Sequence, residues 1–321
     1  MSELRDRIRD AAREVVVHAP FFVPATQRRR LDRWLRGREE LRKLHAADVA
    51  FVSWAKSGRT WVRLMLSRFY QIHCRLPESS FLEFDNLKRR DPAIPSVFFT
   101  HGNYLRDYSG DFTSKQAFYD ARVLLLARDP RDVAVSQYFQ WKHRMRGWKR
   151  YLNDYPEQRD GLSLYEFVME QEAGLPRIVE FLNVWARERP KLRAAHLTRY
   201  EDLRRRPAES LAAMLAFLGT PGSDAEIEEA VRYAAFDNMR RLEETQAYRR
   251  QGRRLVAGER GNPDSYKVRR AKVGGWRDYF DDAQCAAIDG YVRERLDPVY
   301  GYVDAGPPAR ETAAVLHREP A

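Results

Sequence analysis

The chain has 321 residues, of which 44% are hydrophobic and 12% aromatic, so it carries enough apolar material for a large core and is not a disordered chain. Fifty-seven Lys and Arg residues against 46 Asp and Glu give a formal net charge of +11, which favours an anionic partner such as a nucleotide, a nucleic acid, an acidic polymer or a membrane surface. Cys74 and Cys285 form neither a disulfide framework nor a metal-binding spacing, as is typical of a reducing compartment.

The N-terminal region, residues 1–45, is predicted to form two charged helices separated by a break that contains Pro20 and Pro24. The apolar stripe of the first helix either contacts a membrane or a partner, or packs on the protein's own domain. The region lacks the pattern of a signal peptide, and no apolar run approaches the roughly 20 residues needed to span a bilayer. We therefore expect a cytoplasmic protein, with peripheral membrane contact through these helices left open.

From residue 49, short apolar runs alternate with helical stretches. The predicted strands are 49–53, 97–100, 123–127 and 194–197. The main predicted helices are 60–74, 130–144, two that open at capping boxes beginning with Ser163 and Ser223, and 282–296. This alternation predicts an α/β fold in three layers, with a mainly parallel central sheet flanked by helices. We place the domain at residues 46–300, with a C-terminal tail at 301–321 and a long loop at 249–275.

The most informative stretch joins an apolar strand to an amphipathic helix through a turn that contains Lys56 and Gly58. Free backbone N–H groups and the positive end of the helix dipole make such a helix start an anion site. The hydroxyls of Ser57 and Thr60 can donate hydrogen bonds to the same anion. Lys56 precedes the glycine, whereas the nucleoside-triphosphate loop places its lysine after the second glycine. The pattern therefore predicts an anion site of another type.

A second strand-to-helix junction follows the buried run 123–127. The strand ends at Arg128, Asp129 is the predicted helix cap and Pro130 the first helical residue. Arg128 therefore lies at the carboxyl edge of the sheet, where ligands bind in open α/β folds. Ser136 follows about two turns into the helix, near enough to share one anion with Arg128.

A third stretch, residues 266–276, concentrates four cations before a Gly-Gly-Trp sequence. Such a loop either closes over a polyanion or forms a solvated basic face.

Together, in this order, the three stretches resemble the motifs of the sulfotransferases that use 3'-phosphoadenosine 5'-phosphosulfate (PAPS), especially those of the cytosolic type. That family carries a Pro-Lys-Ser-Gly-Thr-Thr-Trp loop, an Arg-(Asn/Asp)-Pro-(Lys/Arg)-Asp-Val-x-Val-Ser junction and an Arg-Lys-Gly-x-x-Gly-Asp-Trp loop. The likeness runs from about residue 49 to 280. It implies a P-loop-like sulfotransferase fold and sulfuryl transfer from PAPS, as co-substrate, to an acceptor hydroxyl without a metal.

The resemblance also implies roles for individual residues. Those around the 5'-phosphosulfate would be Lys56, Ser57, Gly58, Arg59 and Thr60. Those holding the 3'-phosphate would be Arg128, Ser136, Arg269 and Arg270. The aromatic residues at the adenine would be Trp61, Tyr200 and Phe236.

His101 ends an apolar strand where the family carries its catalytic base. A neutral imidazole with an ordinary pKa near 6.5 is suited to taking a hydroxyl proton near neutral pH. We expect His101 to be the base and Lys56 to stabilise the leaving phosphate. Backbone amides after Gly58 would hold the sulfonate.

The chain departs from the family pattern at several positions. Ala55 replaces the loop proline, and Arg59 replaces a threonine. In the third stretch Ala271 replaces a glycine and Gly275 an aspartate. Phe99 stands two residues before His101, where many cytosolic members have a lysine, so one positive charge is missing from that position.

The acceptor is not readable from the sequence and could be a small molecule, a lipid or a carbohydrate, with no nucleic acid as partner. Six aromatic residues form either an apolar acceptor pocket or part of the core: Phe98, Phe99, Tyr104, Tyr138, Phe139 and Trp141. The competing interpretations are a P-loop kinase, a basic nucleic-acid-binding protein and a sulfotransferase-like scaffold without activity. The kinase interpretation lacks the usual lysine spacing, and the nucleic-acid interpretation lacks a recognisable binding motif.

Overall fold

The centre of the protein is a four-stranded, entirely parallel sheet with the strand order β2-β1-β3-β4. The computed structural model describes residues 23–157, 161–249, 255–256 and 262–303. The strands are β1 (Val49–Ser53), β2 (Val97–Thr100), β3 (Arg122–Ala127) and β4 (Ala194–Arg199). All four strands run in one direction, so their carboxyl ends meet at one edge of the sheet.

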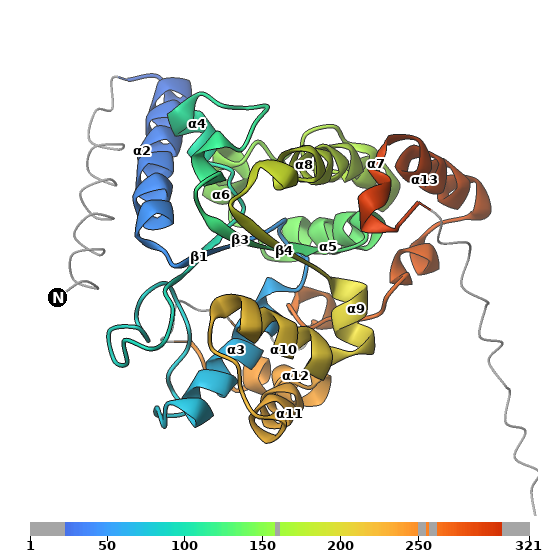
Figure 1. The fold of residues 1–321 in the computed structure, drawn as a ribbon. Helices are drawn as coiled ribbons and strands as arrows, with labels where there is room; N and C mark the ends of the chain where they lie inside the picture. The colour runs from blue at the N-terminus through green and yellow to red at the C-terminus, as the bar shows by residue number, and fades with distance from the viewer. Residues whose placement is uncertain (1–22, 158–160, 250–254, 257–261, 304–321) are drawn as a thin grey trace, which may run out of the picture.

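Helices cover both faces of this sheet, as Figure 1 shows: α3, α10, α11 and α12 lie on one side and α5, α7, α8 and α13 on the other. The three-layer α/β fold expected from the sequence is thus confirmed, and both predicted capping boxes are present. The α-helices are α2 (Ala25–Ala46), α3 (Arg59–His73), α4 (Leu105–Ser109), α5 (Pro130–His143), α6 (Gly147–Leu152), α7 (Leu164–Met169), α8 (Leu175–Glu188), α9 (Tyr200–Arg205), α10 (Pro207–Leu218), α11 (Asp224–Tyr233), α12 (Phe236–Glu244) and α13 (Asp282–Arg295). Short 3-10 turns are η1 (Gln116–Phe118), η2 (Arg189–Lys191), η3 (Pro263–Ser265), η4 (Gly275–Tyr279) and η5 (Pro298–Tyr300).

The central strands are buried on both faces, which explains their unbroken apolar runs. In β1, Val49 and Phe51 join the core beneath α3 and α10, whereas Ala50 and Val52 join the core beneath α5 and α8. Successive side chains of a strand point to opposite faces, so a parallel strand covered by helices on both sides needs apolar residues at every position. Two packed cores therefore hold the carboxyl edge of the sheet in place.

Helix α2 packs on the domain through its contact with α4. A Cβ atom added to Gly37 would lie 2.2 Å from the carbonyl oxygen of Tyr104, so the two backbones approach as closely as a glycine permits. The guanidinium of Arg33 also pairs with the carboxylate of Asp107 at 2.9 Å. Thus the second predicted N-terminal helix packs on its own protein, while the first lies outside the described residues. Among the described helices, none is both long and apolar enough to cross a membrane.

Candidate functional site

A cavity of about 570 Å³ opens where the loops after all four strands converge. Eleven Lys and Arg residues line it, against two carboxylates. Like charges crowded around one hollow raise its positive potential, and a ligand that carries several negative charges relieves that repulsion. The cavity is therefore suited to a polyanion.

The loop after β1 has an unusual backbone that presents Lys56 to this cavity. Lys56 and Gly58 both adopt left-handed conformations, with φ of 70° and 98°. A Cβ on Gly58 would also lie 2.7 Å from the ring of Tyr200, so glycine is needed on two counts. Helix α3 then begins at Arg59, and no described side chain caps its first turn. Free N–H groups at such a helix start can bind an anion, and the anion site expected here from the sequence stays a prediction.

Burial, together with the positive charges of Arg144 and Lys267, lowers the pKa of Lys56 to about 7. A negative ligand would supply the missing counter-charge and restore the ammonium form. The state of Lys56 is thus coupled to anion binding.

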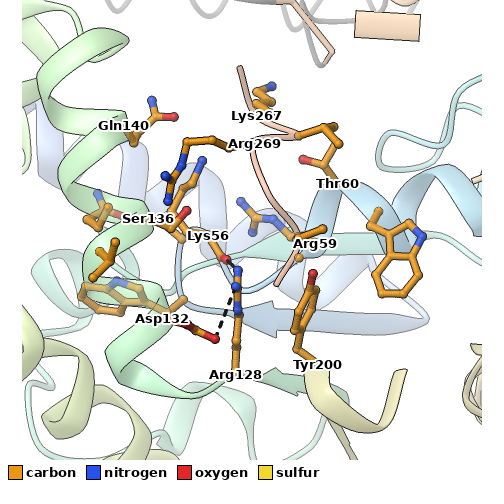
Figure 2. Close-up of a pocket in the computed structure, with 18 of the residues that line it drawn as sticks. Lys56, Arg59, Thr60, Arg128, Asp132, Ser136, Gln140, Tyr200, Lys267 and Arg269 are labelled. Carbon is orange, nitrogen blue, oxygen red and sulfur yellow. Dashed lines mark hydrogen bonds and ion pairs between the residues drawn. The ribbon is translucent and has the colours of Figure 1, made fainter. Parts of the chain in front are cut away.

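The second junction is built as expected: the Asp129 side chain accepts a hydrogen bond from the backbone N–H of Arg131, and Pro130 opens α5. Arg128 donates from Nη1 to the carbonyl oxygen of Lys56 at 3.0 Å (Figure 2). Its guanidinium also lies 4.3 Å from the centre of the Tyr200 ring. Arg128, which the resemblance assigns to the 3'-phosphate, thereby supports the Lys56 loop, which the resemblance assigns to the 5'-phosphosulfate.

Asp132 connects the third stretch to the second. Its carboxylate accepts hydrogen bonds from the backbone N–H groups of Gly274 (2.8 Å) and Trp276 (3.0 Å), and it lies 3.7 Å from Arg128. Burial raises the pKa of this carboxyl group. In the same stretch Ala271 has a φ of 51°, a left-handed conformation at a position where the family carries glycine.

Another buried carboxylate, that of Glu243, fixes the start of the third stretch. It accepts hydrogen bonds from the backbone N–H groups of Lys267 (2.8 Å) and Val268 (3.0 Å), and from Arg144 at 3.2 Å. This anchor could not be predicted from the sequence, because Glu243 fits the helical pattern in the same way as a surface residue. It holds Lys267 over the Lys56 loop (Figure 2).

His101 lies at the end of β2 with both ring nitrogens engaged. Nδ1 is 2.6 Å from the carbonyl oxygen of Ser53, which can only accept, so Nδ1 carries the proton. Burial and the charge of Arg59 lower the pKa of His101 to about 3, which leaves Nε2 as an unprotonated acceptor. Arg59 donates from Nη2 to this nitrogen at 2.7 Å. The arginine that replaces the family's threonine thus covers the candidate base.

The structure brings most of the predicted site residues to the one cavity. Those that line it are Lys56, Gly58, Arg59, Thr60, Trp61, His101, Arg128, Ser136, Tyr200, Phe236, Arg269 and Arg270. Ser57 is buried and is not among the residues that line it. The ring of Trp61 contacts that of Tyr200 edge-on at 5.8 Å, while Arg270 reaches outward to Asp278 at 3.2 Å.

Of the six aromatic residues that the sequence suggested for an acceptor pocket, only some line the cavity. Tyr104 lines the cavity, whereas Phe98, Tyr138 and Trp141 are buried in core clusters. Phe99 packs against Arg63 and Phe139 against Arg269. The lining residues that sequence reasoning missed include Arg36, Glu40, Gln137, Trp148, Asn153 and Tyr155. Gly37 was the one sequence signal that α2 packs closely against another part of the protein, since a glycine inside a long helix often marks a close contact.

The comparisons with known proteins agree with this geometry. The model of the sulfotransferase domain family matches residues 46–299. The chain is 23% identical to a flavonol 3-sulfotransferase of Flaveria bidentis, covering 80% of this chain and 84% of that protein. It is 21% identical to human sulfotransferase 2A1, covering 78% and 84%.

Solved structures show the same fold. Mouse sulfotransferase SULT7A1 complexed with PAP superposes with a TM-score of 0.54 at 18% identity, covering 83% of this chain and 92% of that one. Retinol dehydratase in complex with androsterone and inactive cofactor PAP gives 0.53 at 18% identity, with coverages of 85% and 87%. In the described part of this chain, no three His, Cys, Asp or Glu side chains are grouped so that they could hold a metal ion.

Proposed function

Since this chain belongs to the sulfotransferase domain family, we propose that it transfers a sulfuryl group from PAPS to an acceptor hydroxyl. One observation carries the proposal: the two strand-to-helix junctions and His101 line a single cationic cavity. A doubly phosphorylated nucleotide matches this arrangement, because it carries separate anionic groups for the two junctions.

In the proposed complex, the uncapped first turn of α3 and Lys56 hold the 5'-phosphosulfate. Arg128 and Ser136 hold the 3'-phosphate, with Arg269 and Arg270 above them. Trp61, Tyr200 and Phe236 contact the adenine. The two structural relatives are complexes with PAP, adenosine 3',5'-bisphosphate, which supports this assignment.

The proposed chemistry is an in-line displacement at sulfur. The acceptor oxygen forms a bond to sulfur while the bond from sulfur to the 5'-phosphate oxygen breaks, and the products are a sulfate ester and PAP. Nε2 of His101 takes the hydroxyl proton, since Nδ1–H is fixed on Ser53. Lys56 neutralises the charge that develops on the leaving phosphate. Arg59 must release Nε2 first, and the incoming sulfonate is a natural new partner for its guanidinium.

Calorimetric titration with PAP and with adenosine 5'-monophosphate tests the nucleotide assignment. We expect saturable binding of both, with PAP the tighter. Arg128→Ala should weaken PAP by roughly 10- to 100-fold, since hydrogen bonds to charged groups contribute about 1.5–3 kcal/mol. It should weaken the monophosphate much less, because only the hydrogen bond from Arg128 to the Lys56 loop is lost there. Arg89→Ala is the matched control, because this exposed arginine pairs with Asp85 and does not line the cavity.

An equal loss of both nucleotides in Arg128→Ala would contradict the 3'-phosphate assignment. Absence of PAP binding by folded protein would overturn the proposed function itself. Magnesium-dependent binding of ATP without preference for a 3'-phosphate would instead support a kinase.

A further inference from the structure

We propose that the end of the cavity beyond His101 is a polar subsite for a polyhydroxylated, sugar-like acceptor, closed on one side by α2. The inference rests on the proposed sulfuryl transfer and specifies the acceptor class. It is carried by the side chains of α2, α5 and the segment 145–155 that line this end.

Gln137 of α5 supplies the main observation. It is only 1% exposed, it lines the cavity, and its Nε2 lies 2.5 Å from the hydroxyl oxygen of Tyr155. Its Oε1 has no partner among the described residues. If the amide is turned over, Oε1 accepts from Tyr155 and the NH₂ group is left without one. In either orientation a buried polar group needs a partner, and a ligand hydroxyl can both donate and accept.

Further polar groups line the cavity together with Gln137. The Tyr104 hydroxyl donates to Oδ1 of Asn153 at 2.9 Å, and both residues line the cavity, as Tyr155 does. Trp54, 8% exposed, also lines it, and its Nε1–H has no described partner. Phenols, amides and an indole N–H offer donors and acceptors in several directions, which suits a molecule with several hydroxyls.

Most of the aromatic residues that could have formed an apolar wall for a flat phenol or a steroid do not line this end. Of the aromatic residues that the sequence offered for such a wall, Phe98, Tyr138 and Trp141 are buried in the core. Trp148, in contrast, lines the cavity and leaves 49% of its surface exposed. One exposed indole face beside amides and phenols is an arrangement that suits a sugar ring, whose C–H face packs on the aromatic ring while its hydroxyls bind at the edges.

Helix α2 contributes the remaining side, although it precedes the segment that the family model matches. The Arg36 guanidinium lies 5.6 Å from the ring centre of Tyr104 and 5.8 Å from that of Trp148, and it pairs with Asp32 at 2.9 Å. Glu40 accepts hydrogen bonds from the Thr100 hydroxyl (3.1 Å) and the backbone N–H of Leu105 (2.9 Å). These contacts fix α2 across the acceptor end, so the subsite is a feature of this chain's own N-terminal helix.

The test combines saturation-transfer NMR and transfer of ³⁵S from labelled PAPS. Methyl β-D-glucoside and lactose are the sugar probes, and 2-naphthol and a 3β-hydroxysteroid are the apolar probes. With PAP-loaded full-length protein we expect saturable sugar binding, and a kcat/KM for the better sugar about tenfold or more above that for either apolar probe. Gln137→Leu should weaken sugar binding roughly tenfold, because it removes the amide hydrogen bonds.

Gln71→Leu is the matched control. Gln71 is as buried as Gln137, but its amide already donates to the carbonyl oxygens of Glu78 and Ser80, and it does not line the cavity. Its replacement should lower the melting temperature without changing sugar binding. PAP binding by each variant shows that it is folded.

The outcomes separate the two proposals. Failure of both sugars to bind PAP-loaded protein, or equal sugar binding by wild type and Gln137→Leu, would overturn the polar subsite. Transfer to 2-naphthol alone would also overturn it, while sulfuryl transfer would stand. Only a failure to bind PAP would remove the proposed function.

Discussion

The two ends of the cavity, the proposed nucleotide end and the proposed acceptor end, are built by different means. The nucleotide end consists of short contiguous motifs: a loop and helix start around Lys56 and a strand-to-helix junction at Arg128, joined by the hydrogen bond between them. The acceptor end brings together α2, the residues after β2, α5 and the segment 145–155, which are far apart in the chain. A polyanion needs backbone N–H groups and charge, which local motifs supply, whereas a neutral acceptor needs a shape that only packed elements form.

The ends also differ in how they are stabilised. Buried carboxylates organise the nucleotide end, where Asp132 and Glu243 accept backbone N–H groups from the third stretch. The acceptor end depends on the position of helix α2, which is set by the contacts of Gly37 and Glu40 with the rest of the domain. Substitutions should therefore affect one end without the other.

The largest expected effect lies where the ends meet, at His101. His101→Ala should lower kcat by roughly 10²–10⁴, the usual contribution of a general base, with little change in PAP affinity. Rapid-quench measurement of sulfuryl transfer, with calorimetry for PAP, checks both numbers. His73→Ala is the control, because His73 lies on the outer surface paired with Glu226. Unchanged turnover in His101→Ala would remove the residue from the role of base.

A pH titration tests the role of Lys56 at the nucleotide end. The pKa of Lys56 is about 7 in the free protein, and a bound anion must raise it. PAP affinity should therefore be full below pH 7 and fall as pH rises above it, by up to about tenfold per pH unit for one proton taken up. Calorimetry in buffers of different ionisation enthalpy measures that proton.

Lys56→Arg serves as the matched variant, since arginine stays charged at every pH in this range. It should bind PAP with a flat dependence from pH 7 to 9. A slope that persists in this variant would assign the titration to another group.

The smallest effect is expected from substitutions that change how α2 packs on the domain. Gly37→Ala places a Cβ 2.2 Å from the Tyr104 carbonyl oxygen, and such overpacking costs about 1–3 kcal/mol. Gly290→Ala in α13 meets open space, so it should stabilise the protein by about 0.5–1 kcal/mol. Urea unfolding compares the two substitutions. Gly37→Ala should also raise the KM for the acceptor while the PAP affinity is kept, and a loss of PAP affinity instead would show that the ends are not independent.

Much of the fold was predictable, because the signals were local. The unbroken apolar run of β1, the proline and aspartate that open α5, and the capping boxes at Ser163 and Ser223 each act within a few residues. For the nucleotide end, the position of Lys56 before Gly58 and of Arg128 at a strand end predicted residues that the structure brings to one cationic cavity. These patterns depend on backbone geometry, which neighbouring residues set.

The tertiary structure alone decided the rest. The position of Gln137 in the helical pattern does not show whether its amide has a hydrogen-bond partner within the protein or binds a ligand. Likewise, the sequence around Phe98 is the same whether its ring lines a pocket or lies in the core. Arg59 covers His101 because β1 and β2 are neighbours in the sheet, and α2 reaches the acceptor end because Gly37 fits Tyr104. Contacts between residues distant in the chain depend on how whole elements pack, and no local pattern encodes that packing.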